Sequence, residues 1–321
     1  MLMSISISAY KSRENIDVSM KTLSQFAALT EATFNAIICR SKRKQLQKLL
    51  LNIENFIKIS KDHERNMIQK YTDRYMTFIL IVATSFVVAA ITVICEPLVL
   101  PMEFPINVWY PFSTKPPLRK FIIYNLQIFV IAHTVSCLGV DVMIAVLLFY
   151  PTAKLEILAS EIEQATNEIQ VISCIRKHQE ITRFVSETQE ATQYVLFKTT
   201  LTMGFTVISG SFPILYLQSY ILIPQFLSMI IAALQRMYIT AWAANDLKEV
   251  STRLCWSVYS VSWIGNSQKV KNDVFLMLQR SQKPLLISMS GLLPSLTLEY
   301  YGGFIVSVMS YFMTMRAAIV K

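Results

Sequence analysis

The sequence predicts an all-α fold, a polytopic bundle of transmembrane helices, and three observations lead to that prediction. The chain is 53% hydrophobic and 16% charged, whereas an average soluble domain carries about 25% charged residues. Several apolar stretches are long enough to cross a hydrocarbon core about 30 Å thick. Basic residues gather in alternate loops, which is typical of membrane proteins whose basic loops stay in the cytoplasm.

Two stretches are the clearest spans. Met76 to Cys95 holds no charged residue, and Phe121 to Tyr150 holds only Asp141. Towards the C-terminus, prolines divide the longer apolar runs into separate helices, because proline ends or kinks a helix. The prediction is about six spans in one domain over residues 1–321, at about 18–39, 76–96, 121–150, 192–217, 221–245 and 294–320.

The stretch 18–39 has two interpretations. Its small and apolar residues are interrupted by Lys21 and Glu31, so a cytoplasmic amphipathic helix is the alternative to a span. We keep it as a span. With six spans the N-terminus and the C-terminus lie on the same side of the membrane.

The loops predict which side each end of the bundle faces. Ten lysines and arginines lie between Arg40 and Arg74, which marks this segment as cytoplasmic. The segment 97–120 then lies outside, and its six prolines and the pair Trp109 and Tyr110 fit an interfacial loop. The predicted cytoplasmic helical segments are 40–74, 151–191 and 246–290, and the C-terminus is predicted to be extracellular.

The cytoplasmic segments are predicted to form a packed helical layer. One stripe of apolar residues at spacings of three and four, the pattern of a helix that packs on other helices, consists of Leu155, Leu158, Ile162, Ala165, Ile169 and Ile172. A second stripe consists of Leu46, Leu49, Leu50, Ile53 and Ile57. For this second stripe, lying on the inner membrane surface is a comparable interpretation.

Catalytic and metal-binding patterns are absent from the sequence. His63, His133 and His178 are scattered, and the five cysteines include no CxxC pair, so neither a zinc site nor a disulfide framework is predicted. No HExxH, GxSxG or glycine-rich phosphate loop occurs. We therefore predict no enzyme, no metal and no cofactor. The net charge of +9 follows from the basic loops and needs no nucleic-acid partner.

Four ionisable residues fall within or near the predicted spans, namely Asp141, Lys198, Arg236 and Glu299. Such residues are functional candidates because a charge inside a membrane is costly. The alternative is that they face a watery cavity or reach an interface. That alternative is at least as good for Lys198 and Glu299, which lie near predicted span ends.

The last span carries a stripe of small and polar residues at spacings of four, three, four and four, namely Gly303, Ser307, Ser310, Thr314 and Ala318. A water-lined pore would use such a face. Close packing of helices through small residues uses the same residue types. Spacing alone leaves both interpretations open.

The tail carries a series of motifs in a specific order. It consists of Tyr259, Trp263, Arg280-Ser281-Gln282-Lys283-Pro284, Gly291, Pro294-Ser295-Leu296, Ser310-Tyr311-Phe312 and Arg316. This series resembles the C-terminal signature of insect odorant receptors, and the upstream pattern of spans and loops agrees more loosely. The resemblance implies a seven-span receptor in the plasma membrane of olfactory sensory neurons, with an intracellular N-terminus and an extracellular C-terminus.

The resemblance also implies a mechanism and partners. The subunit would form a heterotetramer with the common odorant co-receptor among membrane lipids, bind volatile lipophilic molecules and pass a non-selective cation current as a ligand-gated channel. In that family the last helix lines the pore, which favours the pore interpretation of the stripe. The gate positions of the co-receptor match Thr314 and Ala318 here, which are smaller and more polar than a gate needs, so gating is expected to rest with co-receptor subunits.

The resemblance places the ligand within the outer half of the membrane, among the spans at 18–39, 76–96, 121–150 and 221–245. The residues expected to line this apolar pocket with a few polar groups are Val88, Ile91, Thr92, Tyr124, Gln127, Ile128 and Ile131. One departure concerns the span count. Counted back from the tail, the span at 18–39 resembles the second of the family, so a counterpart of the first is expected to be missing, through an incomplete gene model or a truncated product.

Two other functions are weighed against this one. A G-protein-coupled chemosensory receptor resembles the chain in span count and in the triplet Asp73-Arg74-Tyr75. In those receptors, however, the triplet follows the third span, whereas here it precedes a span that leaves the cytoplasm. A small-molecule membrane transporter would show paired repeats with broken helices, and no internal repeat is evident.

Overall fold

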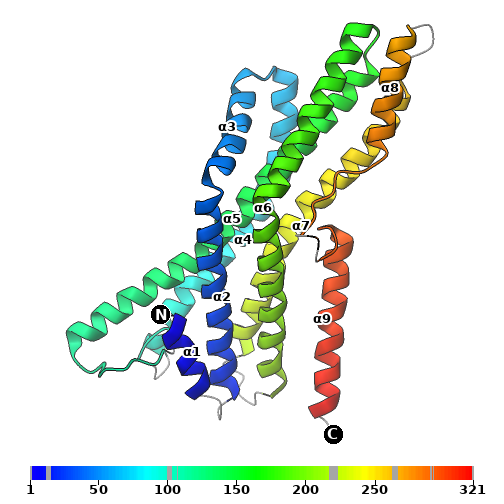
Figure 1. The fold of residues 1–321 in the computed structure, drawn as a ribbon. Helices are drawn as coiled ribbons and strands as arrows, with labels where there is room; N and C mark the ends of the chain where they lie inside the picture. Colours follow the sequence, from blue (N-terminus) through cyan, green and yellow to red (C-terminus); the bar gives the residue numbers. More distant parts are fainter. Residues whose placement is uncertain are drawn as a thin grey trace.

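The computed structural model describes residues 2–11, 16–99, 103–106, 108–216, 223–261, 267–289, 291 and 293–319, and the regular structure in them is helical (Figure 1). The helices are α1 (Leu2–Lys11), α2 (Ile16–Ser41), α3 (Arg43–Ile59), α4 (Asp62–Val99), α5 (Pro117–Glu163), α6 (Glu168–Tyr216), α7 (Ile223–Tyr259), α8 (Gln268–Ser281) and α9 (Leu298–Ile319). This arrangement confirms the predicted all-α bundle.

Long helices continue through boundaries at which separate elements were predicted. The predicted span 121–150 and the start of the cytoplasmic segment 151–191 form one helix, α5, which passes through Pro151 and contains 47 residues. At 1.5 Å per residue it is about 70 Å long, more than twice the thickness of a hydrocarbon core. α5 is therefore long enough to contain the predicted span and to continue into the predicted cytoplasmic layer.

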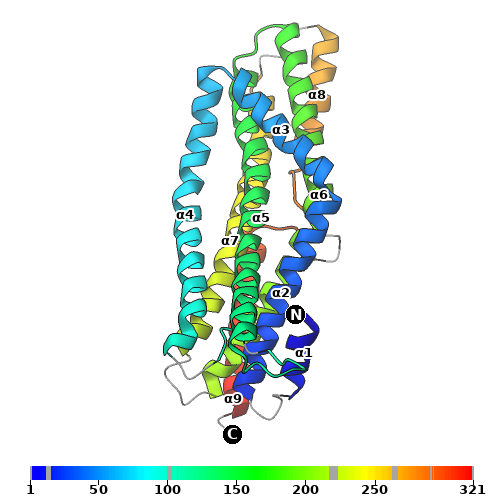
Figure 2. The ribbon, with the colours of Figure 1, turned by 90° about the vertical axis from the view of Figure 1, so that its left-hand side faces the viewer.

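The two ends of the bundle separate the segments that the loops assign to opposite sides. In Figures 1 and 2 the α3–α4 turn, the α5–α6 turn and α8 gather at one end, and the C-terminus and the segment 103–116 lie at the other. We call these the inner and the outer end. The predicted outer turn at 217–221 lies outside the described residues.

Three helical stretches in the described part of the chain are long and apolar enough to cross a membrane, namely Asp62–Leu98, Pro117–Glu163 and Phe226–Tyr259. They contain the predicted spans 76–96 and 121–150 and most of 221–245. The spans predicted at 18–39, 192–217 and 294–320 fall on α2, α6 and α9. Their place in a membrane stays a prediction.

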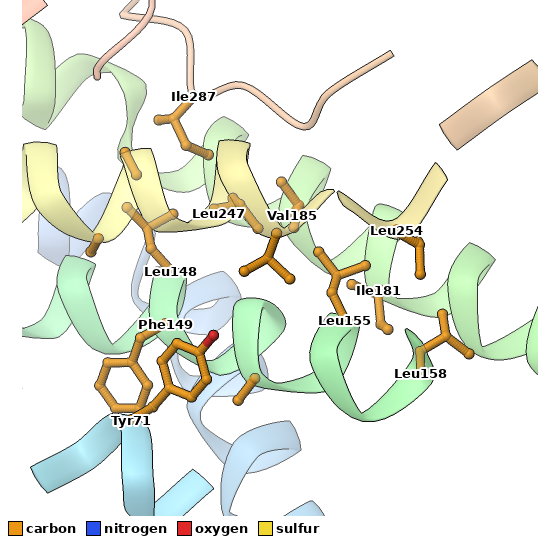
Figure 3. Packing of buried hydrophobic residues seen from close by; sticks show 14 of the residues in the cluster. Tyr71, Leu148, Phe149, Leu155, Leu158, Ile181, Val185, Leu247, Leu254 and Ile287 are labelled. Atoms are coloured by element: carbon orange, nitrogen blue, oxygen red, sulfur yellow. The ribbon is translucent and has the colours of Figure 1, made fainter. Parts of the chain in front are cut away.

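The main apolar core lies in the inner half, where α4 to α8 meet. Leu155 and Leu158 on α5, Ile181 on α6 and Leu247 on α7 are buried in one cluster, and Ile287, from the segment that leads to α9, joins it beside α7 (Figure 3). The stripe predicted on α5 ends at Ala165, because the chain turns there before α6 begins. Ile169, predicted to continue the stripe, is 81% exposed.

α3 is held against the bundle. Leu46, Leu49 and Ile53 of the second predicted stripe are buried against Tyr150 of α5 and Phe184 of α6. The other two members of that stripe, Leu50 and Ile57, are exposed. This amphipathic helix therefore uses one face for packing and leaves apolar side chains on another.

The segment between α8 and α9 turns at Gly291. Its φ of +70° lies in the left-handed region that glycine adopts without steric cost. Leu296 donates its backbone N–H to the Ile287 carbonyl at 2.9 Å, which closes the turn. Pro294, predicted to start the last span, lies in this turn, and α9 begins four residues later at Leu298.

Candidate functional site

An apolar cluster fills the outer end of the bundle. Ile5 of α1, Leu29 of α2 and Ile131 of α5 are buried with Ile106, which belongs to the outer segment 103–116. Ala90, Val93 and Ile94 of α4 are among the partly buried residues that pack on it. We call this group the outer cluster. It lies among three of the four spans between which the ligand pocket was predicted.

Two polar side chains hold the outer segment and α4 to α5. Gln127 is buried, and its amide accepts the backbone N–H of Ile106 at 2.9 Å and donates to the carbonyl of the same residue at 3.1 Å. The same amide donates to the Tyr110 hydroxyl at 3.3 Å. Tyr124 donates its hydroxyl to the Ile94 carbonyl at 2.8 Å. Both residues were predicted to be polar groups of the pocket.

The predicted pocket residues divide into two sets. Gln127 and Ile131 are buried, and Tyr124 and Ile128 are half-buried. Val88 is 62% exposed and Ile91 55% exposed, and Thr92 is exposed too. Of the predicted residues, Ile131 belongs to the outer cluster, and Gln127 and Tyr124 bind its members Ile106 and Ile94.

Residues that sequence reasoning did not select also belong to the outer cluster, namely Ile5, Leu29, Ile94 and Ile106. The stretch 76–95 is apolar around its whole circumference, so its pattern does not show which face packs inward. The outer segment joins the cluster through the contacts of Gln127 with Ile106, 21 residues away. No local sequence pattern predicts this pairing. The pocket lining stays a prediction.

A buried ionic cluster joins α2, α5 and α7 deeper in the bundle. Arg236 donates Nε–H to Asp141 Oδ2 at 2.5 Å and Nη2–H to Glu31 Oε1 at 2.6 Å. The side chains of Arg236, Glu31 and Asp141 are 8%, 2% and 1% exposed. Thr199 of α6 donates to the same Glu31 oxygen at 3.4 Å. Four helices therefore meet at one guanidinium and two carboxylates.

The ionic cluster contains more acidic than basic groups. Two carboxylates face one guanidinium, and each of the three side chains is at most 8% exposed, so the two acids and the base depend on one another for compensation of charge. Breaking such a network by removing one partner leaves an uncompensated buried charge. The cluster therefore fixes α7 relative to the helices that surround the outer cluster.

Of the four ionisable residues singled out in the sequence, Asp141 and Arg236 meet in this cluster, and Lys198 and Glu299 do not. Lys198 is half-buried on α6. Glu299 lies in the first turn of α9, with its side chain 87% exposed and 3.9 Å from Lys248. A carboxylate at a helix N-terminus is favoured by the helix dipole, so Glu299 has an ordinary structural role. Glu31, noted only as an interruption of a span, is the residue that sequence reasoning missed.

α9 presents the predicted pore stripe on its free side. Gly303, Ser307, Ser310 and Thr314 are exposed, and the side chain of Ala318 lies outside the described residues. The Ser307 and Thr314 hydroxyls donate to carbonyls one turn earlier, at 2.9 and 2.8 Å. Serine and threonine hydroxyls satisfied in this way tolerate water or a neighbouring helix.

The opposite side of α9 packs on α6 and α7. The Tyr301 ring lies 5.6 Å from the Tyr238 ring of α7. Phe304 lies against Gly204 of α6, where an added Cβ would meet its ring at 3.5 Å. Val308 packs on a small buried cluster of α6 and α7. The stripe therefore points away from the rest of its own chain.

Metal-ligand geometry does not occur among the described residues, where no group of three or more His, Cys, Asp or Glu side chains could hold an ion. The cysteines Cys39, Cys95, Cys137, Cys174 and Cys255 are free. What the described residues offer is an apolar outer cluster with amide and hydroxyl groups at its edge, a buried ionic cluster beneath it and a helix with an uncovered polar stripe.

Comparison with known proteins gives a consistent family. A family model described as "7tm Odorant receptor" matches residues 15–302. Odorant receptor 10 of Aedes albopictus is 27% identical over 157 residues, which span 48% of this chain and 41% of that receptor. Odorant receptor 23a of Drosophila melanogaster is 18% identical over 244 residues, which span 73% of this chain and 64% of that receptor.

A solved structure extends the likeness to the fold. The olfactory receptor OR5 from Machilis hrabei, in complex with eugenol, superposes with a TM-score of 0.80 at 15% identity, covering 99% of this chain and 86% of that one. A second structure of the same receptor superposes with a TM-score of 0.80 at 15% identity, covering 98% of this chain and 85% of that one. The matched region includes all three features described above.

Proposed function

The chain belongs to the insect odorant receptor family, and from this premise we propose that it is a subunit of a ligand-gated, non-selective cation channel that detects volatile lipophilic chemicals together with a co-receptor. It is a multi-pass membrane protein of a family that is not an enzyme family. We place it in the plasma membrane of olfactory sensory neurons, with its C-terminus outside.

The uncovered face of α9 is the observation that carries the channel proposal. This helix contacts the rest of the chain on one side, while the stripe Gly303, Ser307, Ser310 and Thr314 is exposed. Large apolar side chains flank the stripe, and Val306 is 69% exposed. A helix with a polar stripe between apolar flanks suits a position in which the stripe meets water and the flanks meet neighbouring subunits or lipid.

The outer cluster supports a ligand site of matching chemistry. Its side chains are aliphatic or aromatic, and the Gln127 amide and the Tyr124 hydroxyl lie at its edge. Small-molecule sites are mostly apolar with a few polar groups that fix orientation. A lipophilic molecule that carries one hydroxyl or carbonyl group would suit this composition. It would bind by displacing side chains of the cluster or the outer segment that Gln127 holds.

The test is voltage-clamp recording on cells that express this chain alone, the co-receptor alone, or both. The proposal expects a fast cation current in response to a panel of volatile compounds only when both chains are present. The current should persist when G proteins are inhibited. A response that needs this chain alone and disappears with G-protein inhibition would instead support a G-protein-coupled receptor, and substrate uptake without current would support a transporter.

A further inference from the structure

A basic cavity lies at the inner end of the bundle, whereas the outer cluster fills the outer end. It has a volume of about 280 Å³ and lies between α3, α5 and α6, with Lys48, Tyr150, Lys154, Arg183 and Phe184 among its lining residues. A second hollow, of about 490 Å³, adjoins it along α3 and shares Lys48 and Asn52 with it. None of the residues predicted to bind odorants lines either hollow.

The lining carries more positive than negative charge. Lys44, Lys48, Lys154 and Arg183 face Glu180 and Glu187. Glu187 is already shared by Lys48 at 2.9 Å and Arg183 at 3.0 Å, and the hydrogen bond from Lys48 lowers the pKa of the Glu187 carboxyl below its usual value. Two lysines, Lys44 and Lys154, remain without an ion pair to any residue in the described part of the chain.

Lys154 is held at the wall of the cavity by aromatic rings. Its Nζ lies 4.6 Å from the centre of the Phe56 ring and 5.7 Å from that of Tyr150. Contacts with ring faces attract an ammonium group but leave its hydrogen-bond donors unused. This lysine is therefore positioned for an anionic acceptor.

The hydroxyl of Tyr150 independently indicates a missing ligand. Tyr150 is 2% exposed, and its oxygen is buried without a hydrogen-bond partner. Burying a hydroxyl without a partner is unfavourable, so native proteins seldom leave one unsatisfied. Tyr150 and Lys154 lie one turn apart on α5 and both line the cavity. The Tyr150 oxygen itself is closed off from solvent, so one acceptor can serve both side chains only after the Tyr150 ring turns towards the cavity.

We propose that this cavity binds a phosphate monoester on the headgroup of an anionic lipid of the inner leaflet, with Lys154, Arg183 and the Tyr150 hydroxyl as donors. Phosphate oxygens accept several charge-assisted hydrogen bonds at once, and guanidinium and ammonium groups are their usual donors. Tyr150 and Pro151, at the end of the predicted span 121–150, line the cavity, so we expect it to lie at headgroup depth. Leu51, 54% exposed on α3, lines the second hollow and offers apolar surface beside the headgroup.

The test uses the purified full chain in detergent and native mass spectrometry or thermophoresis with three probes. These are dioctanoyl phosphatidylinositol bisphosphate, soluble inositol trisphosphate, and dioctanoyl phosphatidylserine, which is anionic but has no phosphate monoester. Binding of the first probe in preference to the third supports the site. Equal binding of inositol trisphosphate also supports it and assigns the ligand to a free phosphate compound, because the acyl chains then add nothing. No binding of either phosphorylated probe would overturn the proposal.

The variants distinguish a built site from a generally basic surface. Lys154→Met should weaken binding of the phosphorylated probe about tenfold or more, since one charge-assisted donor is lost. Lys58→Met is the matched control, because Lys58 lies on α3 but is 66% exposed, pairs with Glu54 and lines neither hollow. It should bind within about twofold of the unmodified chain. Equal affinity of Lys154→Met and the unmodified chain, or an equal loss in Lys58→Met, would contradict the proposal.

Tyr150→Phe gives a second, independent answer. If the hydroxyl has no partner in function, its removal leaves the fold equally stable or more stable and binding unchanged. If it donates to phosphate, binding weakens about threefold to tenfold while the unliganded chain keeps its melting temperature. Unchanged binding in this variant would remove Tyr150 from the site and would contradict the geometry proposed here.

Discussion

Arg236 on α7 donates to Asp141 on α5 at 2.5 Å, across 95 residues of sequence, in the interior of the helical bundle. Because the same guanidinium also binds Glu31, α2, α5 and α7 cannot separate without exposing charge to an apolar interior. The pair thereby connects the helices around the outer cluster with the helix on which α9 packs. Stability and gating are both expected to depend on it.

Replacing Arg236 tests this connection. Arg236→Met leaves two carboxylates buried without a cation, and removal of one partner of a buried pair costs about 3–5 kcal/mol. We expect a marked loss of folded protein, measured by fluorescence-detected size exclusion after heating in detergent. Arg236→Lys keeps the charge but not the two-sided geometry and should give an intermediate loss.

Two controls make the Arg236 result specific. Arg65→Met, at an exposed position of α4, should leave the melting temperature unchanged. Combining Arg236→Met with Asp141→Asn removes one of the stranded charges and should recover part of the lost stability. A double variant no more stable than Arg236→Met alone would show that the pair is not energetically coupled.

Gln127 is expected to control the outer segment. Gln127→Leu removes an acceptor and donors that hold Ile106, and leaves a buried backbone N–H unsatisfied at a cost of about 1–3 kcal/mol. Hydrogen exchange of a peptide covering 103–116 should accelerate accordingly. Asn125→Leu, an exposed change on the same helix, is the control. Equal exchange in the two variants would show that another contact holds the segment.

Thr314 tests the pore proposal. With the co-receptor present, Thr314→Cys should react with aqueous thiol reagents and the current should change, because the position is exposed on the free side of α9. Val308→Cys is the matched control, since Val308 packs on the buried cluster of Met203, Val207 and Ala233 and should react slowly. If both cysteines react alike, or Thr314→Cys is inert, the stripe serves helix packing.

His178 predicts a dependence of stability on pH. It is buried in the inner layer, and burial, followed by repulsion from Arg280, holds the pKa of its imidazole below 6.5. The unfolded chain therefore binds a proton at higher pH than the folded chain. The contribution of neutral His178 is fully present above about pH 6.5 and is lost as the pH falls from there towards the lowered folded pKa.

His178 alone changes the free energy of unfolding by at most about 1.4 kcal/mol per pH unit. His178→Asn should reduce the change in melting temperature between pH 7.5 and pH 5.5, two conditions on either side of the ordinary histidine pKa of about 6.5. His63→Asn changes an exposed histidine and should keep the full dependence. A pH response that is unaltered by the loss of His178 would assign it to other groups.

More of the fold than of the candidate site can be predicted from the sequence. Uninterrupted apolar length predicts helices at 76–96 and 121–150, because a membrane accepts little else over such a stretch. It does not predict that α5 runs on through Pro151, since proline usually marks a break in a helix. Packing of Leu155 and Leu158 in the inner core keeps that helix continuous, and such packing is not local information.

The candidate site depends on pairings that no local pattern contains. Asp141 and Arg236 were each recognisable as costly charges in apolar surroundings, yet Glu31 lies 205 residues from Arg236. Val88 and Ile91, also predicted to line the pocket, are exposed in this chain, and a helix that is apolar all round gives no sign of its inward face. Their place in a pocket stays a prediction.

α7 carries two sets of contacts that join different parts of the molecule. Arg236 holds α2 and α5, and Asn245, on the same rigid helix, accepts the backbone N–H of Leu298 at the first turn of α9 at 3.4 Å. At 1.5 Å per residue the two anchor points are about 14 Å apart. If α7 rotates as one body about its own length, both anchors turn together. We therefore expect a displacement at the outer cluster to reach the start of α9 without any loop having to refold.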